Sequence, residues 1–320
     1  MVYLGIDLGG TNIKVAAVDE SCTILAEANR DTQMERGPEA ICDDIAAAMC
    51  ETAARLGLQL SDVAGLGVGC PGTIDNDTGI VIYSNNLDWH DFGMRSYLKQ
   101  KTGLTAVMGN DANVAALGEV QAGGAKGAQS AVIITLGTGL GSGVVLDGQI
   151  LTGYTGAASE IGHMIIQDGG VPCTCGRSGC LESYASATAL IRMTREAIAQ
   201  NPQSCMAALA AGQGTVNGRT SFDAMREGCA TGQAVVNQYI HYLAVGLSNV
   251  INIFYPEVIC LSGGISKEGE TLLAPLREKT YALVYGGMDT NRRYTRIEAC
   301  TLGHKAGLIG AAMLPATAKQ

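Results

Sequence analysis

Four side chains that can bind a metal lie close together near the middle of this 320-residue chain. His163 is followed by Cys173, Cys175 and Cys180, and two glycines lie between the last two cysteines. Three thiolates and one imidazole suit a closed tetrahedral zinc site, which leaves no position open for a substrate. The spacing therefore predicts a structural Zn²⁺ ion. The alternative is three reduced cysteines in a loop beside an unrelated histidine.

Two glutamates, Glu160 and Glu182, flank this cysteine segment. Carboxylates accept hydrogen bonds from hydroxyl groups, so both could hold a ligand that carries a row of hydroxyls, such as a sugar. A zinc ion would then fix the loop that presents them. The alternatives are contacts to the metal ligands and ordinary surface charges.

Each half of the chain contains an apolar segment that ends in a glycine-rich turn. Residues 3–8 are followed by Gly9-Gly10-Thr11-Asn12, and residues 131–136 are followed by Gly137-Thr138-Gly139-Leu140-Gly141. A second apolar run follows each turn, which predicts two β-hairpins. Glycine lets several backbone N–H groups approach a phosphate closely, and the later pair Gly263-Gly264 adds a third such turn.

The residues around these turns predict a nucleotide site. Thr11 and Thr138 add hydroxyl donors, and Asp7, near the end of the first strand, is placed to hold Mg²⁺ through water. A dinucleotide-binding fold does not fit, because residues 137–141 lead into a strand instead of a helix. The sequence also lacks a Walker-type phosphate loop. A paired-hairpin grip on ATP, as in the actin-like ATPases, is the remaining interpretation.

Asn110 and Asp111 lie between a predicted strand and a predicted helix. Aspartate at such a junction is favoured as a helix N-cap, because its carboxylate accepts hydrogen bonds from the first N–H groups of the helix. The helix dipole also keeps a carboxylate ionised there, as a proton acceptor requires. Asp111 is therefore a candidate catalytic base, and both roles stay open.

The remaining segments predict an α/β protein built from a duplicated unit with a cleft between the copies. The polar, glycine-rich stretch 201–221 is predicted to be a loop or lid. The other predicted elements are helices over 41–56, 112–121 and 307–314, and strands over 63–68, 105–108 and 258–261.

Composition excludes several classes of protein. A formal net charge of −9 argues against nucleic acid or an anionic membrane as the main partner. No apolar run of about 18 residues and no signal peptide is found, which predicts a cytoplasmic protein. Of the 11 cysteines, the eight outside the cluster are expected to be reduced core thiols, among them Cys42, Cys50 and Cys260.

Taken together, these motifs resemble the ROK family of bacterial sugar kinases, and within it the ATP-dependent glucokinases. The resemblance covers essentially the whole chain. It rests on residues 7–14, Gly69-Cys70-Pro71-Gly72, Asn110-Asp111-Ala112-Asn113, Leu136 to Gly143, Glu160 to His163, the cysteine segment through Glu182, and Leu261 to Ile265.

The resemblance implies a two-lobed actin-like ATPase (ribonuclease H-like) fold with ATP, Mg²⁺ and sugar in the cleft between the lobes. The small lobe is expected over residues 1–118 plus 302–320, where the last helix returns, and the large lobe with the zinc site over 119–301. A homodimer or homotetramer is expected, with no nucleic-acid or membrane partner.

The resemblance also implies a role for particular residues, with Asp111 as the base that accepts the proton of the sugar hydroxyl. The expected sugar contacts are Gly72, Asn86, Asn110, Asp111, Glu160, His163 and Glu182. The expected ATP contacts are Asp7, Gly9, Gly10, Thr11, Lys14, Gly137, Thr138, Gly139, Gly263 and Gly264. The expected zinc ligands are His163, Cys173, Cys175 and Cys180.

Two positions depart from the family pattern. Asn85 stands where proline is common, which bears on the contact of Asn86 with sugar, and Ser262 stands where a third glycine is usual. Lys14 either approaches a phosphate or is a solvated strand lysine.

The reaction expected is phosphorylation of a hexose, glucose above others, at its 6-hydroxyl. N-acetylmannosamine, fructose, mannose and allose are alternative substrates, because epimers differ by a single hydroxyl. A sugar-responsive regulator would need a basic DNA-binding extension ahead of Gly5, and an actin-like assembly ATPase would lack the sugar glutamates and the cysteine cluster.

Overall fold

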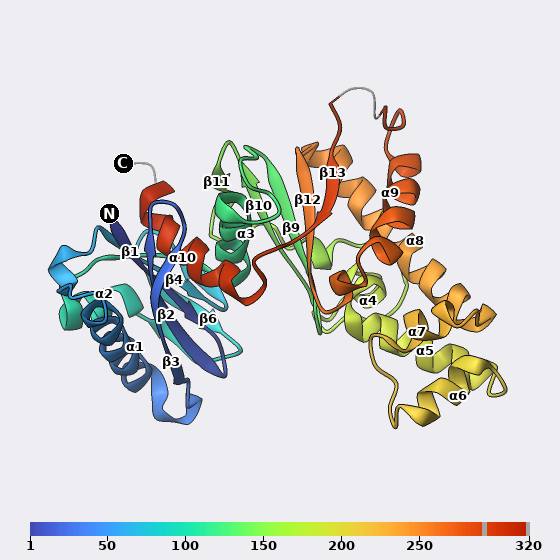
Figure 1. The fold of residues 1–320 in the computed structure, drawn as a ribbon, viewed down its shortest axis with the longest axis horizontal. Coiled ribbons are helices and arrows are strands. Elements are labelled where there is room, and N and C mark those ends of the chain that lie inside the picture. Colours follow the sequence, from blue (N-terminus) through green and yellow to red (C-terminus); the bar gives the residue numbers. More distant parts are fainter. Residues whose placement is uncertain (290–292, 318–320) are drawn as a thin grey trace. The chain divides into compact units, whose positions relative to one another are not determined.

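A computed structural model describes residues 1–289 and 293–317 of the chain, which group into two compact α/β units (Figure 1). The first unit contains Met1–Ile133, Gly143–Ser159 and the chain from Cys300 onward, and the second contains Ile134–Ser142 and Glu160–Ala299. The predicted division of the lobes after residue 118 remains a proposal. No helix among the described residues has the length and apolar character needed to cross a bilayer.

The first unit is built on a sheet with the strand order β3-β2-β1-β4-β8. Strands β1 and β2 pair antiparallel, whereas β4 pairs parallel with both β1 and β8. The predicted first hairpin is therefore confirmed. The strands are β1 (Val2–Leu8), β2 (Asn12–Asp19), β3 (Ile24–Asp31), β4 (Gly65–Cys70) and β8 (Ala106–Asn110).

A second sheet has the order β11-β10-β9-β12-β13. Numbered along the chain, both sheets thus follow the order third, second, first, fourth, fifth, which confirms the predicted duplication. The turn Gly137–Gly139 joins two neighbouring strands of this sheet, as predicted. The strands are β9 (Ala131–Leu136), β10 (Leu140–Leu146), β11 (Gln149–Ile150), β12 (Val258–Gly263) and β13 (Arg296–Ala299).

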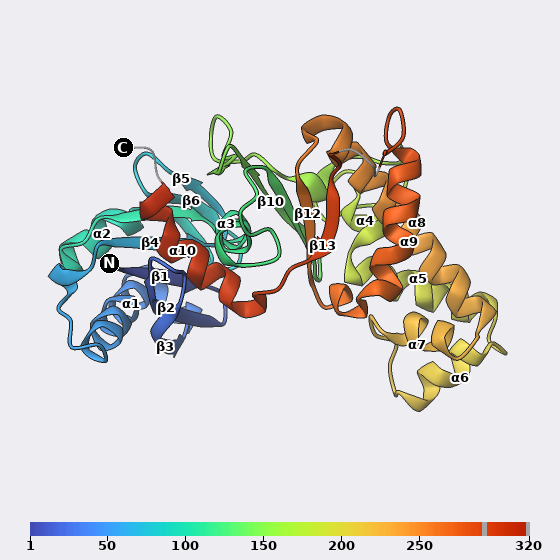
Figure 2. The ribbon, with the colours of Figure 1, turned by 45° about the horizontal axis from the view of Figure 1, so that its top comes forward.

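A smaller sheet, β5-β6-β7, and several helices complete the first unit (Figure 2). The small strands are β5 (Thr73–Asp75), β6 (Ile80–Ser84) and β7 (Trp89–Phe92). The α-helices are α1 (Gly37–Ala54), α2 (Met94–Thr102), α3 (Asp111–Ala122) and α10 (Ala306–Thr317). The 3₁₀ helices are η1 (Met34–Arg36), η2 (Leu60–Asp62) and η5 (Gly303–Lys305).

The last helix, α10, packs against the first sheet because glycines let it approach closely. A Cβ atom on Gly5 would lie 2.2 Å from the carbonyl oxygen of Leu308, and one on Gly67 would lie 1.8 Å from that of Ala311. Both distances are far below a possible contact, so only glycine fits. The predicted return of the last helix to the first unit is confirmed.

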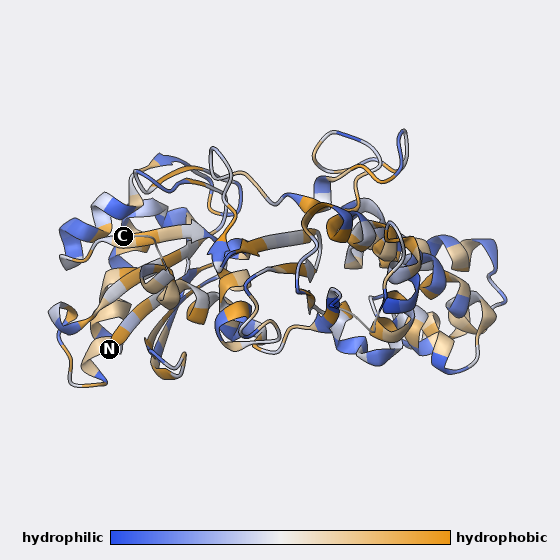
Figure 3. Cartoon of the chain, turned by 90° about the horizontal axis from the view of Figure 1, so that it is seen from above, coloured by the Kyte–Doolittle hydropathy of each residue, from blue (hydrophilic) through white to orange (hydrophobic). Residues whose placement is uncertain are grey.

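The second unit carries most of its helices beyond the glycine turn and the cysteine segment. Its α-helices are α4 (Glu182–Ala185), α5 (Ala187–Gln200), α6 (Cys205–Gly212), α7 (Thr220–Arg226), α8 (Ala230–Phe254) and α9 (Glu270–Leu283). Its 3₁₀ helices are η3 (Ile161–His163) and η4 (Ile265–Glu268). In both units hydrophobic residues follow the strands, and hydrophilic residues gather in loops and on outer helix faces (Figure 3).

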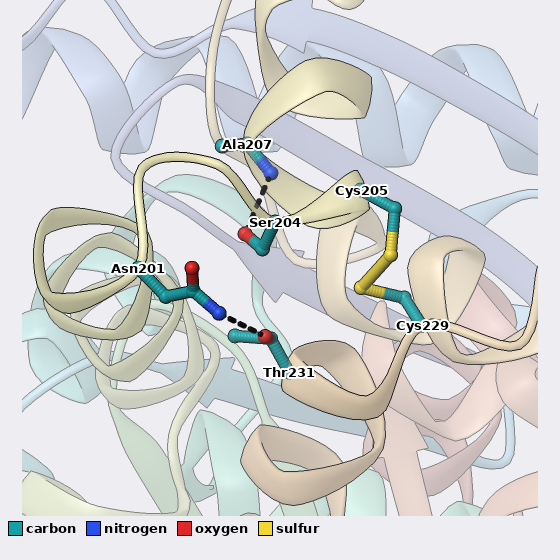
Figure 4. Close-up of a disulfide and its surroundings, with 6 residues drawn as sticks. All are labelled: Asn201, Ser204, Cys205, Ala207, Cys229 and Thr231. Carbon is teal, nitrogen blue, oxygen red and sulfur yellow. Dashed lines mark hydrogen bonds between the residues drawn. A yellow bond between two sulfur atoms is a disulfide. The ribbon is translucent and has the colours of Figure 1, made fainter.

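The predicted loop over residues 201–221 is wrong, because this stretch contains α6 and the start of α7. The hydroxyl of Ser204 caps α6 by accepting a hydrogen bond from the N–H of Ala207 (Figure 4). Alanines follow this cap, and alanine has the highest helix propensity. The short helix outweighs the polar, glycine-rich composition on which the prediction rested.

A disulfide joins Cys205 and Cys229, with an S–S distance of 2.19 Å (Figure 4). It ties the beginning of α6 to the residue before α8. The expectation that all eight scattered cysteines are reduced core thiols is therefore wrong for this pair. It is also wrong for Cys50, which is a free thiol but exposed, whereas Cys42 and Cys260 are free and buried as expected.

Candidate active site and metal cluster

Asp7 lies near the carboxyl end of β1, directly across from Lys14 on β2. Its Oδ2 atom is 3.9 Å from the Lys14 Nζ atom. Burial raises the pKa of the Asp7 carboxyl, and the Lys14 ammonium opposes that shift. Lys14 thus lies beside Asp7 at a strand end and is partly exposed, and its approach to a phosphate stays a prediction. The Lys14 ammonium could pair with a phosphate oxygen, whereas the Asp7 carboxylate would need a Mg²⁺ ion between itself and a phosphate.

The first glycine turn is held by hydrogen bonds on both sides. The N–H of Gly9 donates to the carbonyl of Asn12 at 2.9 Å, and the Thr32 hydroxyl donates to the carbonyl of Gly9 at 2.6 Å. A Cβ atom on Gly10 would lie 3.1 Å from the carbonyl oxygen of Asn86. The fold thus brings the predicted phosphate turn beside the exposed turn that carries Asn86. Thr11 is exposed.

Asn110, not Asp111, is the N-cap of α3. Its Oδ1 atom accepts hydrogen bonds from the N–H groups of Ala112 at 3.0 Å and Asn113 at 3.4 Å. Its Nδ2 atom donates to the carbonyl of Gly72 at 3.1 Å. The cap function therefore belongs to the neighbouring residue, and Asp111 is left as the first residue of the helix.

Gly72 has a φ of 108°, a backbone conformation that residues other than glycine rarely adopt. A Cβ atom there would also lie 2.2 Å from the carbonyl oxygen of Tyr83. This close packing fixes the Gly72 carbonyl, which accepts the hydrogen bond from Asn110. Gly72, Asn110 and Asp111 therefore form one rigid corner at the end of the first sheet.

Asp111 is half-buried. Burial raises the pKa of its carboxyl, and hydrogen bonds from the N–H of Ala112 and from Asn110 oppose this shift. The Oδ1 atom lies 2.9 Å from the Ala112 nitrogen. The environment thus makes Asp111 a stronger base than an exposed aspartate while the helix N-terminus still supports its charge.

In the second unit, the turn Gly137–Gly139 is tied to the helices that follow the cysteine segment. The N–H of Ala187 donates to the carbonyl of Gly137 at 2.9 Å, and the Thr188 hydroxyl donates to that of Thr138 at 2.7 Å. These two hydrogen bonds hold the turn through its backbone carbonyl groups and do not involve its side chains.

Glu182 connects this turn to the cysteine segment. Its Oε2 atom accepts a hydrogen bond from the N–H of Leu140 at 2.9 Å, and a Cβ atom on Gly139 would lie 2.3 Å from the same oxygen. Its Oε1 atom lies 3.4 Å from the Thr174 hydroxyl and 3.7 Å from the Cys173 Sγ atom. The predicted sugar ligand is thus in contact with a predicted phosphate turn and with a predicted metal ligand.

The turn after β12 contains Gly263 and Gly264. Gly263 has a φ of 91°, and a Cβ atom on it would lie 2.3 Å from the carbonyl oxygen of Leu136 on β9. A Cβ atom on Gly264 would meet only open space. Ser262, which departs from the family pattern, is hydrogen-bonded to the Thr135 hydroxyl at 2.8 Å. Its side chain is therefore accommodated within the sheet.

The four predicted zinc ligands converge in the structure. One ligand atom from each of His163, Cys173, Cys175 and Cys180 lies within 4.8 Å of every other. The Cys173 Sγ atom is 3.6 Å from the His163 Nδ1 atom, and the Sγ atoms of Cys175 and Cys180 are 3.7 Å apart. Two sulfurs each about 2.3 Å from one zinc ion lie about 3.8 Å apart in a tetrahedron. The geometry therefore fits zinc.

The thiols of this cluster differ in their surroundings. Hydrogen bonds from the backbone and side chain of Arg177 lower the pKa of Cys175 to about 6. Burial raises the pKa of Cys180 to about 12. Arg177 also donates from Nη2 to the carbonyl of His163 at 3.1 Å, which holds the histidine side of the cluster.

Glu160 is the residue directly before η3, the short helix that ends at His163. It is exposed. The N–H of His163 donates to the carbonyl of Glu160 at 3.0 Å, and the Ser142 hydroxyl accepts from the N–H of Ile161 at 3.2 Å. The predicted residues thus form two groups, one in each unit. The roles predicted for them in binding and catalysis remain predictions.

Sequence reasoning missed Glu119, a buried carboxylate on α3 with 2% exposure. Its Oε2 atom accepts hydrogen bonds from the N–H groups of Gly124 at 2.8 Å and Thr301 at 3.1 Å. Its Oε1 atom accepts from the N–H of Leu302 at 3.0 Å. It therefore fixes the segment by which the chain re-enters the first unit. A glutamate within an alanine-rich helix carries no signal of such long-range contacts.

Comparison with known proteins identifies the family of this chain. The sequence matches the ROK family over residues 3–318. The chain belongs to the ROK family. A glucokinase from Halalkalibacterium halodurans is 38% identical to this ROK protein over 317 residues, which cover 98% of this chain and 94% of that one.

Two solved structures resemble this ROK protein along their whole length. The crystal structure of a ROK family glucokinase from Streptomyces griseus, in complex with glucose and AMPPNP, is 33% identical with a TM-score of 0.76, and the match covers 98% of this chain and 99% of that chain. A ROK hexokinase from Thermus thermophilus is 32% identical with a TM-score of 0.81, and the match covers 98% and 97%. The two-lobed actin-like fold predicted from the sequence is confirmed.

Proposed function

We propose that this ROK protein is an ATP-dependent glucokinase that transfers a phosphoryl group to the 6-hydroxyl of glucose. The observation that carries the chemistry is the position of Asp111. Its neighbour Asn110 caps the helix, so the Asp111 carboxylate is not needed as a cap, and burial raises its pKa toward that of a useful base. The choice of glucose is supported by the glucokinases that resemble the chain.

In this proposal Asp111 orients the sugar hydroxyl and accepts its proton as the bond to phosphorus forms. The transition state of phosphoryl transfer is loose, so an enzyme gains most by positioning the reactants and neutralising charge. A single base held by a helix N-terminus at the end of a sheet suits this requirement. The rigid corner of Gly72 and Asn110 supports its position.

Phosphate binding is assigned to the two glycine turns, with the backbone N–H groups of Gly9, Gly10 and Thr11 in one unit and Gly137–Gly139 in the other. Lys14 and Asp7 would contribute charge at the first turn. Magnesium supplied with ATP would neutralise phosphate charge, and Asp7 is the carboxylate available to hold it through water. Gly263 and Gly264 are assigned to the adenosine.

The sugar is assigned to Asn86, Asn110 and Asp111 in the first unit, and to Glu160, His163 and Glu182 in the second. The cluster of His163 and the three cysteines would hold a structural zinc ion that keeps these residues in place. The Nδ1 atom of His163 is the one turned toward Cys173. Coordination through Nδ1 leaves Nε2 protonated, so it would donate a hydrogen bond to a sugar hydroxyl.

The test is a coupled ADP-release assay on the purified protein with a panel of sugars. We expect kcat/KM to be highest for glucose. A higher value for N-acetylmannosamine, fructose, mannose or allose would replace the substrate and leave the kinase assignment intact. Turnover with none of them would contradict the proposed function.

We further propose that the protein acts in the cytoplasm as a homodimer or homotetramer. Size-exclusion chromatography with light scattering measures the oligomeric state.

A further inference from the structure

The hydroxyl of Tyr184 ties α4 to the loop that leads into the metal cluster, residues 167–180, which we call the metal loop. Tyr184 lies on α4, two residues after Glu182, and is only 4% exposed. Its hydroxyl accepts a hydrogen bond from the N–H of Val171 at 2.7 Å. A Cβ atom on Gly170 would lie 2.1 Å from the same oxygen, so the loop packs closely against this hydroxyl.

Val171 is hydrogen-bonded through both of its backbone groups. Besides the bond to Tyr184, its carbonyl accepts a hydrogen bond from the N–H of Gly179 at 2.8 Å. Cys173 lies two residues after Val171, and Cys180 directly follows Gly179. The paired backbones of Val171 and Gly179 thus lie next to two of the four cluster residues, and Tyr184 holds this pair from α4.

The same short helix carries Glu182, which contacts the metal loop from another side. Successive residues of a helix are about 100° apart, so Glu182 and Tyr184 leave α4 in nearly opposite directions. The Oε1 atom of Glu182 lies 3.4 Å from the Thr174 hydroxyl. A one-turn helix held on two sides cannot rotate about its axis without breaking one of these contacts. The Tyr184 hydrogen bond therefore fixes the direction of the Glu182 carboxylate.

Other side-chain contacts between α4 and the metal loop are longer and more exposed. The Ser183 hydroxyl donates to the carbonyl of Pro172 at 3.2 Å in an exposed position, and the contact to Thr174 is also exposed. The ring of Tyr184 packs against the ring of Tyr242 on α8, with the ring centroids 4.5 Å apart. A hydrogen bond that is shielded from water is electrostatically stronger than an exposed one. Tyr184 thus makes the firmest of these contacts.

We propose that Tyr184 is a positioning residue whose hydroxyl holds the metal loop and Glu182 in the orientation that binds the sugar. This inference rests on the proposed function, in which Glu182 contacts the sugar. Asp111, the proposed base, belongs to the other unit and is held by a corner of its own. Loss of the Tyr184 hydroxyl should therefore weaken sugar binding without slowing the turnover of bound sugar. It should also let zinc leave faster, because the backbone pair beside the cysteines loses its support.

The test is Tyr184→Phe, which keeps the buried ring and leaves the N–H of Val171 without its acceptor. We expect the dissociation constant of glucose, measured by calorimetry, and KM for glucose to rise about 3- to 10-fold, the effect of one hydrogen bond. The transfer of zinc to a coloured chelator should accelerate by a similar factor. Both kcat and KM for ATP should change less than about 2-fold.

The matched control is Tyr242→Phe, which removes a hydroxyl from the neighbouring ring and keeps the bond between Tyr184 and Val171. It should leave glucose affinity and zinc release unchanged. A lower melting temperature in Tyr184→Phe with unchanged KM and zinc release would show a merely structural role and overturn the proposal. A fall in kcat at unchanged KM would overturn it as well.

Failure of this proposal and failure of the proposed function are seen in different samples. A wild-type protein that phosphorylates no sugar contradicts the proposed function, whereas this inference is tested by comparing Tyr184→Phe with the wild type. Zinc release requires no turnover, so equal release rates in the two proteins would overturn the role of Tyr184 in holding the metal loop whatever the substrate is.

Discussion

The metal cluster and the corner that carries Asp111 are built in opposite ways. The ligands of the cluster come from one short stretch, residues 163–180, and tight local turns bring their atoms within 4.8 Å. The Asp111 corner and its neighbours come from segments as far apart as Asp7 and Asn110, which meet because parallel strands end at one edge of a sheet. A site of the first kind can be derived from spacing. A site of the second kind requires the fold.

The largest effect is expected at the Asp111 corner. Asp111→Asn keeps the shape of the side chain and removes the proton acceptor, and a positioned base contributes about 10²–10⁴-fold in rate. We therefore expect kcat to fall by that factor, with little change in the affinity for ATP or sugar measured by calorimetry. Turnover close to that of the wild type would remove Asp111 from the mechanism.

Asn110→Ala is the matched control for the role of the cap. It removes the side chain that accepts two N–H groups of α3, so it should lower the free energy of unfolding by about 1 kcal/mol. Asp111→Asn should not lower it, because it replaces a charge that is costly to bury. If Asp111→Asn destabilises the protein more than Asn110→Ala, the cap has been assigned to the wrong residue.

The metal cluster should respond differently, through stability and KM. Cys175→Ser is expected to abolish the binding of about one zinc per chain, to lower the melting temperature and to raise KM for glucose, because Glu182 contacts the same segment. Elemental analysis and thermal melts measure this. Cys50→Ser, at an exposed free cysteine, should leave zinc content unchanged. Wild-type protein prepared without chelator and lacking zinc would contradict the assignment.

Glu119 offers a smaller effect on the first unit alone. Glu119→Ala leaves the N–H groups of Gly124, Thr301 and Leu302 without their acceptor, and hydrogen bonds to a charged group contribute about 1.5–3 kcal/mol each. We expect a loss of roughly 4–5 kcal/mol in denaturant unfolding, the lower end of that range for three bonds. Glu196→Ala, which removes an exposed ion pair with Arg192, should cost less than about 1 kcal/mol. Equal losses would show that the buried hydrogen bonds of Glu119 stabilise the protein no more than an exposed ion pair does.

The smallest effect is a shift in the pH profile. Because burial raises the pKa of Asp111, the ionised base is lost as pH falls through a value above the ordinary aspartate pKa of about 3.9. The acidic limb of kcat/KM for glucose should therefore lie above that value. Asp111→Asn should lose this limb in its residual activity. An acidic limb at or below the ordinary value would show that burial does not tune this residue.

The success of sequence reasoning follows the same contrast between local and long-range order. The two glycine-turned hairpins, the helix after Asp111 and the cysteine cluster depend on neighbouring residues, and all are found in the structure. The contacts of Glu119 with Thr301 and Leu302 depend on residues far away in the chain, so no local pattern predicts them.

The region around residues 201–229 was predicted least well. Its polar, glycine-rich composition favours a loop, but one capping serine and a run of alanines are enough to form α6. The pairing of Cys205 with Cys229 could not be derived from spacing, because it depends on the packing of α6 against the residue before α8. The assignment of the N-cap of α3 to Asn110 instead of Asp111 likewise requires the backbone geometry.

The most direct test of the account is to identify the product by ³¹P NMR. The purified protein is incubated with glucose, ATP and Mg²⁺, and the reaction is followed to completion. We predict equal amounts of ADP and glucose 6-phosphate, with almost no inorganic phosphate, because the hydroxyl oriented by Asp111 competes with water for the phosphoryl group. Release of inorganic phosphate without a sugar phosphate, as from an assembly ATPase, would contradict the account.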